Sequence, residues 1–370
     1  MQIIDMGAVA AQVLWASFGL SVLFGAIAQR THFCTMGAVA DIVNSGDWSR
    51  MRMWALAIGV AMLGFNAMVA AGWIDAGKTI YAAPRLTWLS AIVGGLMFGF
   101  GMVLASGCGS KTLVRIGGGN LKSLVVFIVL GLAAFATIRG ITAVARVATV
   151  DRVAIELAGG QDLPSLAATA FGLAKAQSAL LLGALIGGAL IVWTLARAEG
   201  RSADVLLGGA GIGAVVAAMW WVSGRLGYVA EDPNTLQEAF VATNSQRMEA
   251  LSFVAPIAYA LDWLLFFSDK SKLLTLGIVS TAGVVVGSAV WALASRSFRW
   301  EGFANAEDTG NHLVGAVLMG IGGVTALGCT VGQGLSGVST LAIGSFIALA
   351  SIIAGAVLGV RYQAWRVEAT

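Results

Sequence analysis

Long apolar segments alternate with short polar stretches along most of this 370-residue chain. A segment of about 20 apolar residues has the length that an α-helix needs to cross a lipid bilayer. We count nine such segments, at 7–28, 51–73, 86–105, 121–141, 176–196, 205–222, 273–294, 313–327 and 338–360. The pattern predicts an all-α membrane protein with about nine transmembrane helices in a single integral membrane domain.

Four further apolar pieces are too short or too rich in glycine to cross a bilayer. They lie at 31–45, 107–119, 251–267 and 328–337. Irregular backbone at membrane depth persists only where protein buries it or where it lines a cavity. We therefore expect these pieces to form re-entrant segments or short helices inside the protein.

One glycine-rich sequence occurs twice. Residues 99–108 read GFGMVLASGC and residues 320–329 read GIGGVTALGC, so both follow G-x-G-x-x-x-A-x-G-C at an offset of 221 residues (329 minus 108). Phe33 and Phe253 match at a nearly equal offset of 220 (253 minus 33), which makes Val254 the counterpart of Cys34. The two offsets indicate an internal duplication.

The duplication predicts how the domain is organised. We expect a first repeat at 1–145, a connecting loop and linking helix at 146–200, and a second repeat at 201–370. Moving from a point in the first repeat to the equivalent point in the second crosses the membrane five times, and an odd number inverts one repeat relative to the other. Inverted repeats bring broken helices together near the middle of the membrane, around a central pathway.

Composition and charge agree with a membrane protein and exclude several functions. Only 11% of the residues are charged, against about 25% in a soluble domain. A net charge of +3 is too small and scattered for nucleic acid. No Walker-type phosphate loop is present, so we expect no ATP site. The three cysteines lack the paired spacing of zinc ligands, so we predict no metal and no cofactor.

The distribution of basic residues favours one orientation. If the segments alternate, short flanks on one side of the membrane carry most of the effective positive charge. These residues are Arg50, Arg52, Lys111, Arg115, Lys122, Arg197, Arg201, Arg296, Arg299, Arg361 and Arg366. We expect the N-terminus outside and the C-terminus in the cytoplasm of a cell whose inner (plasma) membrane holds the protein.

The cysteines are the strongest candidates for chemistry. Cys34, Cys108 and Cys329 each interrupt apolar sequence beside glycine. A buried cysteine is usually just a small hydrophobe, but recurrence at a fixed offset favours a site. Backbone N–H groups at a helix start bind anions, and a neutral thiol adds a weak donor and a polarizable sulfur. The ligand that uses both is an anion with a soft sulfur end.

Residues around the thiols complete the candidate site. Those next to the cysteines are His32, Gly107, Gly109, Ser110, Gly328, Thr330 and Gln333. Thr330 and Gln333 are expected to act as uncharged donors that contact an anion without trapping it. A helical two-residue spacing would point His32 away from Cys34, so we assign no catalytic residue.

Three basic residues are candidates for a cationic mouth. They are Arg30, Lys111 and Arg115, and each has a plainer alternative. A helix-end arginine often snorkels to the interface, and Lys111 and Arg115 also fit the positive flank of a cytoplasmic loop.

These motifs resemble the YeeE/YedE family of integral membrane proteins. The resemblance rests on QRTHFC at 29–34, on G-x-G-x-x-x-ASGCG at 99–109 and on G-x-G-x-x-x-ALGC at 320–329, and covers essentially the whole chain. It implies an inverted-repeat fold in which Cys34, Cys108 and Cys329 line a central path. It also implies that thiosulfate passes from thiol to thiol through transient S–H···S hydrogen bonds without being cleaved.

The resemblance further implies a small cytosolic sulfur carrier of the TusA-like kind. Because the sequence ends soon after the last apolar segment, we expect that partner to be a separate protein. The overall expectation is an inner-membrane importer of thiosulfate and not an enzyme.

Other interpretations of the same residues stay open. A membrane thiol enzyme or sulfurtransferase would act through persulfide or redox chemistry, but it needs an accessible cysteine of low pKa. Neither glycine motif shows a base close to its cysteine. Family relatives also handle other sulfur or selenium compounds, which leaves the substrate open. A purely structural subunit is disfavoured by thiols repeated at membrane depth.

Overall fold

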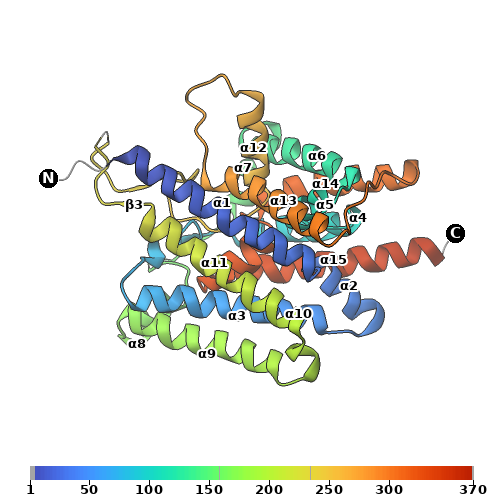
Figure 1. The fold of residues 1–370 in the computed structure, drawn as a ribbon. Helices are drawn as coiled ribbons and strands as arrows, with labels where there is room; N and C mark the ends of the chain where they lie inside the picture. The colour runs from blue at the N-terminus through green and yellow to red at the C-terminus, as the bar shows by residue number, and fades with distance from the viewer. Residues whose placement is uncertain (1–4, 158, 234, 369–370) are drawn as a thin grey trace.

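The computed structural model describes residues 5–157, 159–233 and 235–368, which form a bundle of long helices (Figure 1). Eight helical stretches in these residues are long and apolar enough to cross a membrane. Five are single helices: α3 (Ser49–Ala70), α6 (Leu121–Arg139), α9 (Lys175–Leu195), α13 (Leu276–Ala294) and α15 (Ile343–Glu368). Two combine a long helix with the short one that follows it: α1 (Met6–Arg30) with α2 (Thr35–Ser45), and α4 (Trp88–Leu104) with α5 (Gly109–Gly117). The eighth is continuous through α10 (Ala203–Leu206), η4 (Leu207–Gly211), α11 (Ile212–Trp221) and η5 (Val222–Leu226). The prediction of a helical multi-pass membrane protein is confirmed.

The count of nine spans needs a correction at 313–327. This segment belongs to α14 (Ala306–Thr325), which begins seven residues earlier than expected. Its first turn carries Glu307 and Asp308, and Asn305 caps it by accepting the Asp308 N–H at 2.8 Å. These polar turns shorten its apolar part, so α14 is a long helix that falls outside the eight apolar spans.

The four short apolar pieces all contain helices. They are α2, α5, α12 (Ala255–Leu265) and the π-helix η6 (Gly332–Gly337). The remaining short elements are η1 (Ala76–Lys78), α7 (Ile141–Ala148), η2 (Val150–Arg152), α8 (Leu163–Phe171) and η3 (Ala198–Arg201). Two small antiparallel pairs join β1 (Arg85–Leu86) to β2 (Ile155–Glu156) and β3 (Tyr228–Val229) to β4 (Ala239–Phe240).

Helix packing is reciprocal between the two halves of the chain. The contact of α1 with α13 has its counterpart in the contact of α11 with α3. In the same way, the contact of α4 with α15 corresponds to that of α14 with α6. Likewise α2 contacts α15 while α12 contacts α6. Helices α2 and α12 are both 11 residues long and start 220 residues apart (255 minus 35). In the middle of this arrangement α4 lies against α14.

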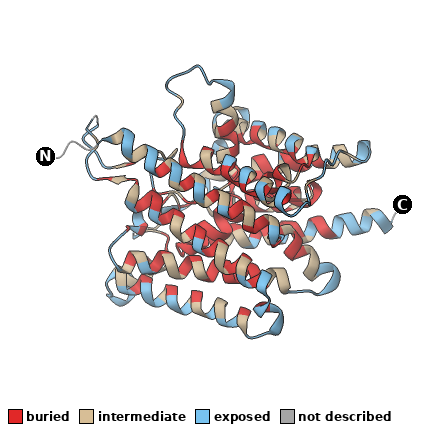
Figure 2. Cartoon of the chain, in the orientation of Figure 1, coloured by how far each residue is buried: buried red, intermediate tan, exposed pale blue. Residues whose placement is uncertain are grey.

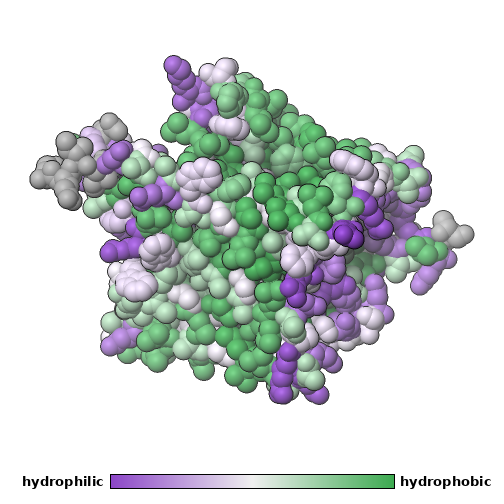
Figure 3. Space-filling model, viewed as in Figure 1, coloured by the Kyte–Doolittle hydropathy of each residue, from purple (hydrophilic) through white to green (hydrophobic). Residues whose placement is uncertain are grey.

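The surface matches a bilayer environment. Buried residues concentrate between the helices, and exposed ones follow the outer faces and the ends of the bundle (Figure 2). Hydrophobic residues cover the middle of the visible face, while hydrophilic ones gather towards its two ends (Figure 3). On helix α9, for example, Leu181, Leu185 and Val192 each expose more than half of their surface. Helix α1 starts at one end of the bundle and α15 finishes at the other (Figure 1).

Glycine permits the closest helix crossings in the centre. A Cβ atom at Gly99 of α4 would overlap the carbonyl oxygen of Ile352 in α15. A Cβ atom at Gly322 of α14 would lie 2.6 Å from the carbonyl oxygen of Gly94 in α4. Small residues let membrane helices approach until their backbones touch. The repeated glycine motif therefore serves first to bring α4, α14 and α15 together.

We predict that Gly99→Leu destabilises the protein, because the new side chain has no space against α15. Overpacking of this kind costs about 1–3 kcal/mol or more. The measurement is the apparent melting temperature of the detergent-solubilised chain. The matched control is Gly188→Leu on α9, where a Cβ meets no atom within 4 Å. Equal melting temperatures for the two variants would contradict this account of the crossing.

Candidate functional site

All three cysteines follow the same kind of helix ending. Two residues before each of them the backbone is left-handed, with φ of 51° at His32, 56° at Ser106 and 61° at Leu327. The next amide then donates to a carbonyl oxygen five residues back, in the pairs Phe33–Ala28 (3.2 Å), Gly107–Met102 (2.8 Å) and Gly328–Gly323 (2.8 Å). This is the Schellman ending of a helix. Because non-glycine residues occupy the left-handed position, the turns are held by their surroundings.

Each cysteine then begins a new helix. Cys34 is the N-cap of α2, Cys108 is the N-cap of α5, and Cys329 directly precedes the helical residues 330–339. The Cys34 sulfur accepts the Gly37 N–H at 3.4 Å, and the Cys329 sulfur accepts the Gly332 N–H at 3.4 Å. These are N-cap hydrogen bonds made by sulfur instead of oxygen. The sulfur accepts through a lone pair, so the S–H proton is free to point elsewhere.

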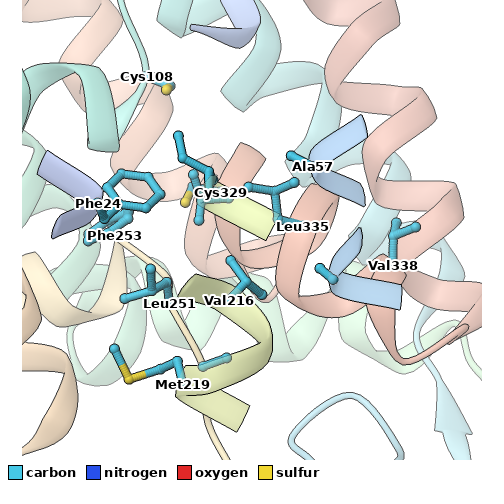
Figure 4. Close-up of a cluster of buried hydrophobic side chains, with 14 of the residues drawn as sticks. Phe24, Ala57, Cys108, Val216, Met219, Leu251, Phe253, Cys329, Leu335 and Val338 are labelled. Carbon is cyan, nitrogen blue, oxygen red and sulfur yellow. The ribbon is translucent and has the colours of Figure 1, made fainter. Parts of the chain in front are cut away.

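The three thiols belong to one buried region. Their exposed fractions are 5% at Cys34, 1% at Cys108 and 0% at Cys329. Cys108 is a neighbour of both Cys34 and Cys329, which makes it the middle member of the series. Its sulfur also lies 3.2 Å from the hydroxyl of Ser110. Cys108 and Cys329 share a cluster of buried side chains with Phe24 and Phe253 (Figure 4).

The segment before α12 packs between the two glycine-cysteine turns. A Cβ atom at Gly109 would lie 2.9 Å from the Phe253 carbonyl oxygen, so only glycine fits there. The backbone amide of Phe253 also interacts with the Cys329 sulfur. Val254 is the N-cap of α12, the position that Cys34 has in α2. The second half therefore places valine where the first half has a thiol, and the set of three is asymmetric.

A basic cavity of about 430 Å³ opens beside Cys34, and we call it the Lys111 cavity. Its lining includes Thr31, His32, Cys34, Arg50, Ser106, Lys111 and Arg115. Arg115 donates to the Ser106 carbonyl oxygen at 2.8 Å and so supports the turn before Cys108. Arg50 is paired with Asp41, to whose carboxylate it donates at 2.8 Å.

Arg115 pairs with no carboxylate in the described ranges, but its guanidinium is directed at the Ser106 carbonyl oxygen. Lys111 also forms no ion pair with any carboxylate there. Its stem lies over Gly107, where a Cβ atom would come within 3.0 Å of the Lys111 Cγ. The ammonium group is therefore held near Cys34 and Cys108 with its charge available to an anion.

His32 connects the Lys111 cavity to a second basic cavity of about 540 Å³. The second cavity is lined by Arg30, Arg296 and Arg299 among others. Arg30 lies 3.9 Å from an Asp204 oxygen and stacks on the Trp291 ring at 5.3 Å. The assumption that His32 sits on a helix is wrong, because it occupies the left-handed turn and is exposed.

Another cavity, of about 460 Å³, lies beside the turn before Cys329, and we call it the Tyr259 cavity. Its lining includes Arg146, Arg247, Glu249, Tyr259 and Gly328. Sequence reasoning missed the first four of these residues, because they come from separate segments that share no local motif. Glu249 accepts the Ser245 N–H at 2.7 Å, and burial raises the pKa of its carboxyl group.

Thr330 and Gln333 differ in what they can offer an anion. The Thr330 hydroxyl is fully buried and has no hydrogen-bond partner in the described structure, so it can donate. The Gln333 amide nitrogen instead donates to the Ala326 carbonyl oxygen at 2.5 Å. Its oxygen is the atom left without a partner. The expectation that Gln333 serves as a free donor is therefore corrected: its free group is an acceptor.

Comparison with known proteins shows the family of this chain. A family model described as "Sulphur transport" matches residues 30–358. The chain belongs to this family. It is 28% identical over 349 residues to the thiosulfate transporter TsuA of Escherichia coli K12, covering 93% of this chain and 92% of that protein.

Two further relatives support the same assignment. The thiosulfate transporter TsuA of Spirochaeta thermophila is 26% identical over 364 residues, which cover 93% of this chain and 97% of the relative. The probable transporter YedE of Salmonella typhimurium is 31% identical over 103 residues, only 26% of this chain and 23% of the relative. The family resemblance seen in the cysteine motifs is confirmed over most of the chain.

We predict that the three thiols differ in their reaction with a water-soluble maleimide. In variants that keep one cysteine each, Cys34 should react at least about tenfold faster than Cys108 or Cys329, because it lines an open cavity whereas the other two are almost fully buried. Mass spectrometry of the intact chain measures the rate. Comparable rates at all three positions would show that the buried region is freely open to water.

Proposed function

We propose that this protein imports thiosulfate across a bacterial inner membrane without chemically changing it. Family membership and two relatives named as thiosulfate transporters over more than nine-tenths of their length support this substrate. The observation that carries the proposal is the series of three thiols at helix starts. One cavity contains Gly328 beside Cys329, and another contains Cys34.

The proposed route runs from the Tyr259 cavity past Cys329, Cys108 and Cys34 to the Lys111 cavity. At each thiol the S–H proton can donate to the terminal sulfur of the ion, and the N–H groups of the helix start favour its negative charge. Gly107, Gly109 and Gly328 keep side chains out of the way. Ser110 and Thr330 add hydroxyl donors. Weak contacts in series suit passage better than one tight site.

We further propose that the two halves are inverted repeats. Reciprocal packing supports this, because each pairing within the first set of helices has its counterpart in the second. Helices α1 and α11 run in opposite directions in the bundle (Figure 1). If α14 crosses the membrane despite its polar first turn, four crossings lie between α4 and α14 (those of α6, α9, α11 and α13), so α4 and α14 run in opposite directions. The proposed division into 1–145, 146–200 and 201–370 places α8 and α9 between the repeats, and its first boundary falls within α7.

The basic end of the route is assigned to the cytoplasm. Arg30, Lys111, Arg115, Arg296 and Arg299 line the two cavities at this end, and positive charge in short loops marks the cytoplasmic face. The orientation puts the start of α1 outside. It also allows a separate TusA-like sulfur carrier to receive the ion at the basic end.

A thiol enzyme is the second candidate, and the geometry supports it less well. A nucleophilic cysteine needs a base or a strongly polar, accessible setting. Cys108 and Cys329 are almost fully buried and are surrounded by apolar side chains. Cys34 is different, because the cations and the exposed histidine beside it favour a thiolate, so a thiol enzyme would have to act there. Other sulfur or selenium anions would use the same contacts as thiosulfate.

We predict that Cys108→Ser and Cys329→Ser each strongly reduce thiosulfate uptake. Serine caps a helix at least as well as cysteine, so the fold should persist while the polarizable sulfur is lost. Growth of a sulfur auxotroph on thiosulfate as sole sulfur source measures the effect, and growth on cysteine shows that the cells are otherwise healthy.

Two outcomes would contradict the relay. Growth of both variants at the rate of the parent would remove the thiols from the mechanism. A cysteine that gains the mass of one sulfur atom during turnover would favour the sulfurtransferase instead. Intact transport with unmodified cysteines supports the relay.

We predict that uptake depends on pH through Glu249. Burial raises the pKa of this carboxyl group, so it becomes neutral as the pH falls towards that raised value. A neutral carboxyl group no longer repels an anion that shares the cavity with Arg146, Arg247 and Tyr259. The apparent KM for thiosulfate should therefore fall at lower pH.

The test compares Glu249→Gln with Glu231→Gln, an exposed glutamate of the same connecting segment. Glu249→Gln should have a low KM at every pH, and Glu231→Gln should behave like the parent. An unchanged pH profile in Glu249→Gln would exclude Glu249 as the cause.

A further inference from the structure

A small polar cavity lies next to the Cys329 turn and plays no part in the proposed anion route. Its volume is about 70 Å³, and we call it the Gln333 cavity. It shares Ile80 and Leu327 with the Tyr259 cavity, so the two spaces flank the same turn. Its size suits a few water molecules or a small hydrated ion. It is too small for a second oxyanion with its hydration.

Two buried oxygen atoms on residues that line this cavity have no hydrogen-bond partner in the described structure. They are Gln333 Oε1 and Ser345 Oγ, on side chains that are 4% and 2% exposed. Both atoms border the space above Gly337, where a Cβ would overlap Ser345 Oγ and lie 2.9 Å from Gln333 Oε1. A third oxygen, Gln161 Oε1, accepts the Gly344 N–H at 3.2 Å on the same wall. Buried oxygens without partners are costly and call for a ligand.

The orientation of Gln333 decides the charge of that ligand. Its amide nitrogen is turned away, donating to the Ala326 carbonyl oxygen at 2.5 Å. The cavity therefore receives the acceptor end of the amide. Acceptor oxygens repel an anion and suit a hard cation.

The charge around the cavity indicates a monovalent cation. The described residues that line the Gln333 cavity include no aspartate or glutamate, whereas Ca²⁺ sites are built largely from carboxylates. The charged residue on the wall is Arg85, whose side chain is half-exposed. Its guanidinium lies 3.8 Å from a Glu156 oxygen and donates to the Asp151 carbonyl oxygen at 2.9 Å. Its charge is thus directed towards the β1–β2 pair.

We propose that the Gln333 cavity binds a sodium ion that is coupled to the thiosulfate held at Cys329, an inference that rests on the proposed function. Gln333 and Ser345 supply oxygens directly, Gln161 completes the wall, and water fills the remaining positions. The turn at 326–328 separates the cation from the Cys329 site. Opposite charges on either side of that turn strengthen the binding of both ions. Broken membrane helices commonly place ion and substrate sites side by side in this way.

The experiment uses the full-length chain in liposomes and measures uptake of ³⁵S-thiosulfate. External NaCl is compared with choline chloride at equal ionic strength. Sodium should lower the apparent KM for thiosulfate at least about fivefold, the lower end of typical coupling between two sites. Coupling is reciprocal, so thiosulfate should raise the affinity for ²²Na⁺ by the same factor.

The decisive variant is Ser345→Ala, with Ser351→Ala as its control on the same helix. The Ser351 hydroxyl donates to the Ile347 carbonyl oxygen at 2.8 Å and does not line the cavity. Ser345→Ala should lose the sodium effect and keep the uptake measured in choline, which also shows that it folds. Ser351→Ala should respond to sodium like the parent.

Three outcomes overturn the proposal. Equal KM values in sodium and choline would show that the cavity holds only water. A full sodium response in Ser345→Ala would place the sodium site elsewhere. Absence of thiosulfate uptake in every salt would refute the proposed function itself, whereas uptake that ignores sodium refutes only this site.

Discussion

Helices that begin inside a membrane protein leave first-turn N–H groups without water, and the structure around the thiols follows from this constraint. An unsatisfied N–H at membrane depth is expensive. At Cys34 and Cys329 the sulfur accepts a hydrogen bond from one such N–H group, with a nitrogen–sulfur distance of 3.4 Å. Aspartate would satisfy it more strongly, but its negative charge would cancel the positive end of the helix. Cysteine is a neutral and weak cap. It therefore leaves the helix start able to attract an anion.

Close packing of the two halves brings these helix starts together. The glycine motif ends in a cysteine, and the same glycines allow α4 to touch α14 and α15 through backbone atoms. The segment at 251–254 then occupies the space between the two turns, with the Phe253 carbonyl oxygen over Gly109. A larger residue at a glycine of the motif, or at Gly109, would separate the turns and widen the distance between the thiols. Packing and function thus depend on the same residues.

Periodic features of this protein could be predicted from the sequence, and features assembled from distant segments could not. Length and hydropathy located the spans, and the repeated motif led to equivalent positions for Cys34 and Val254, which are both helix caps. The polar start of α14 was missed because Glu307 and Asp308 precede the apolar run. Gln333 was misjudged because only its bond to Ala326 reveals which end of the amide is free. Arg146, Arg247 and Glu249 meet in one cavity through tertiary packing alone.

A divalent anion moving into a cell must work against the membrane potential. At 100 mV, inside negative, moving two charges inward costs about 4.6 kcal/mol. Neutral thiols and backbone N–H groups can lower barriers along the route, but they cannot supply this energy, because they interact equally with an ion moving either way. A monovalent cation or proton that accompanies the ion returns about 2.3 kcal/mol of it from the potential, and its own concentration gradient adds to this. Glu249 and the Gln333 cavity lie on either side of the turn that leads to Cys329. Both are therefore placed where a coupling charge would act on an anion at the first thiol of the route.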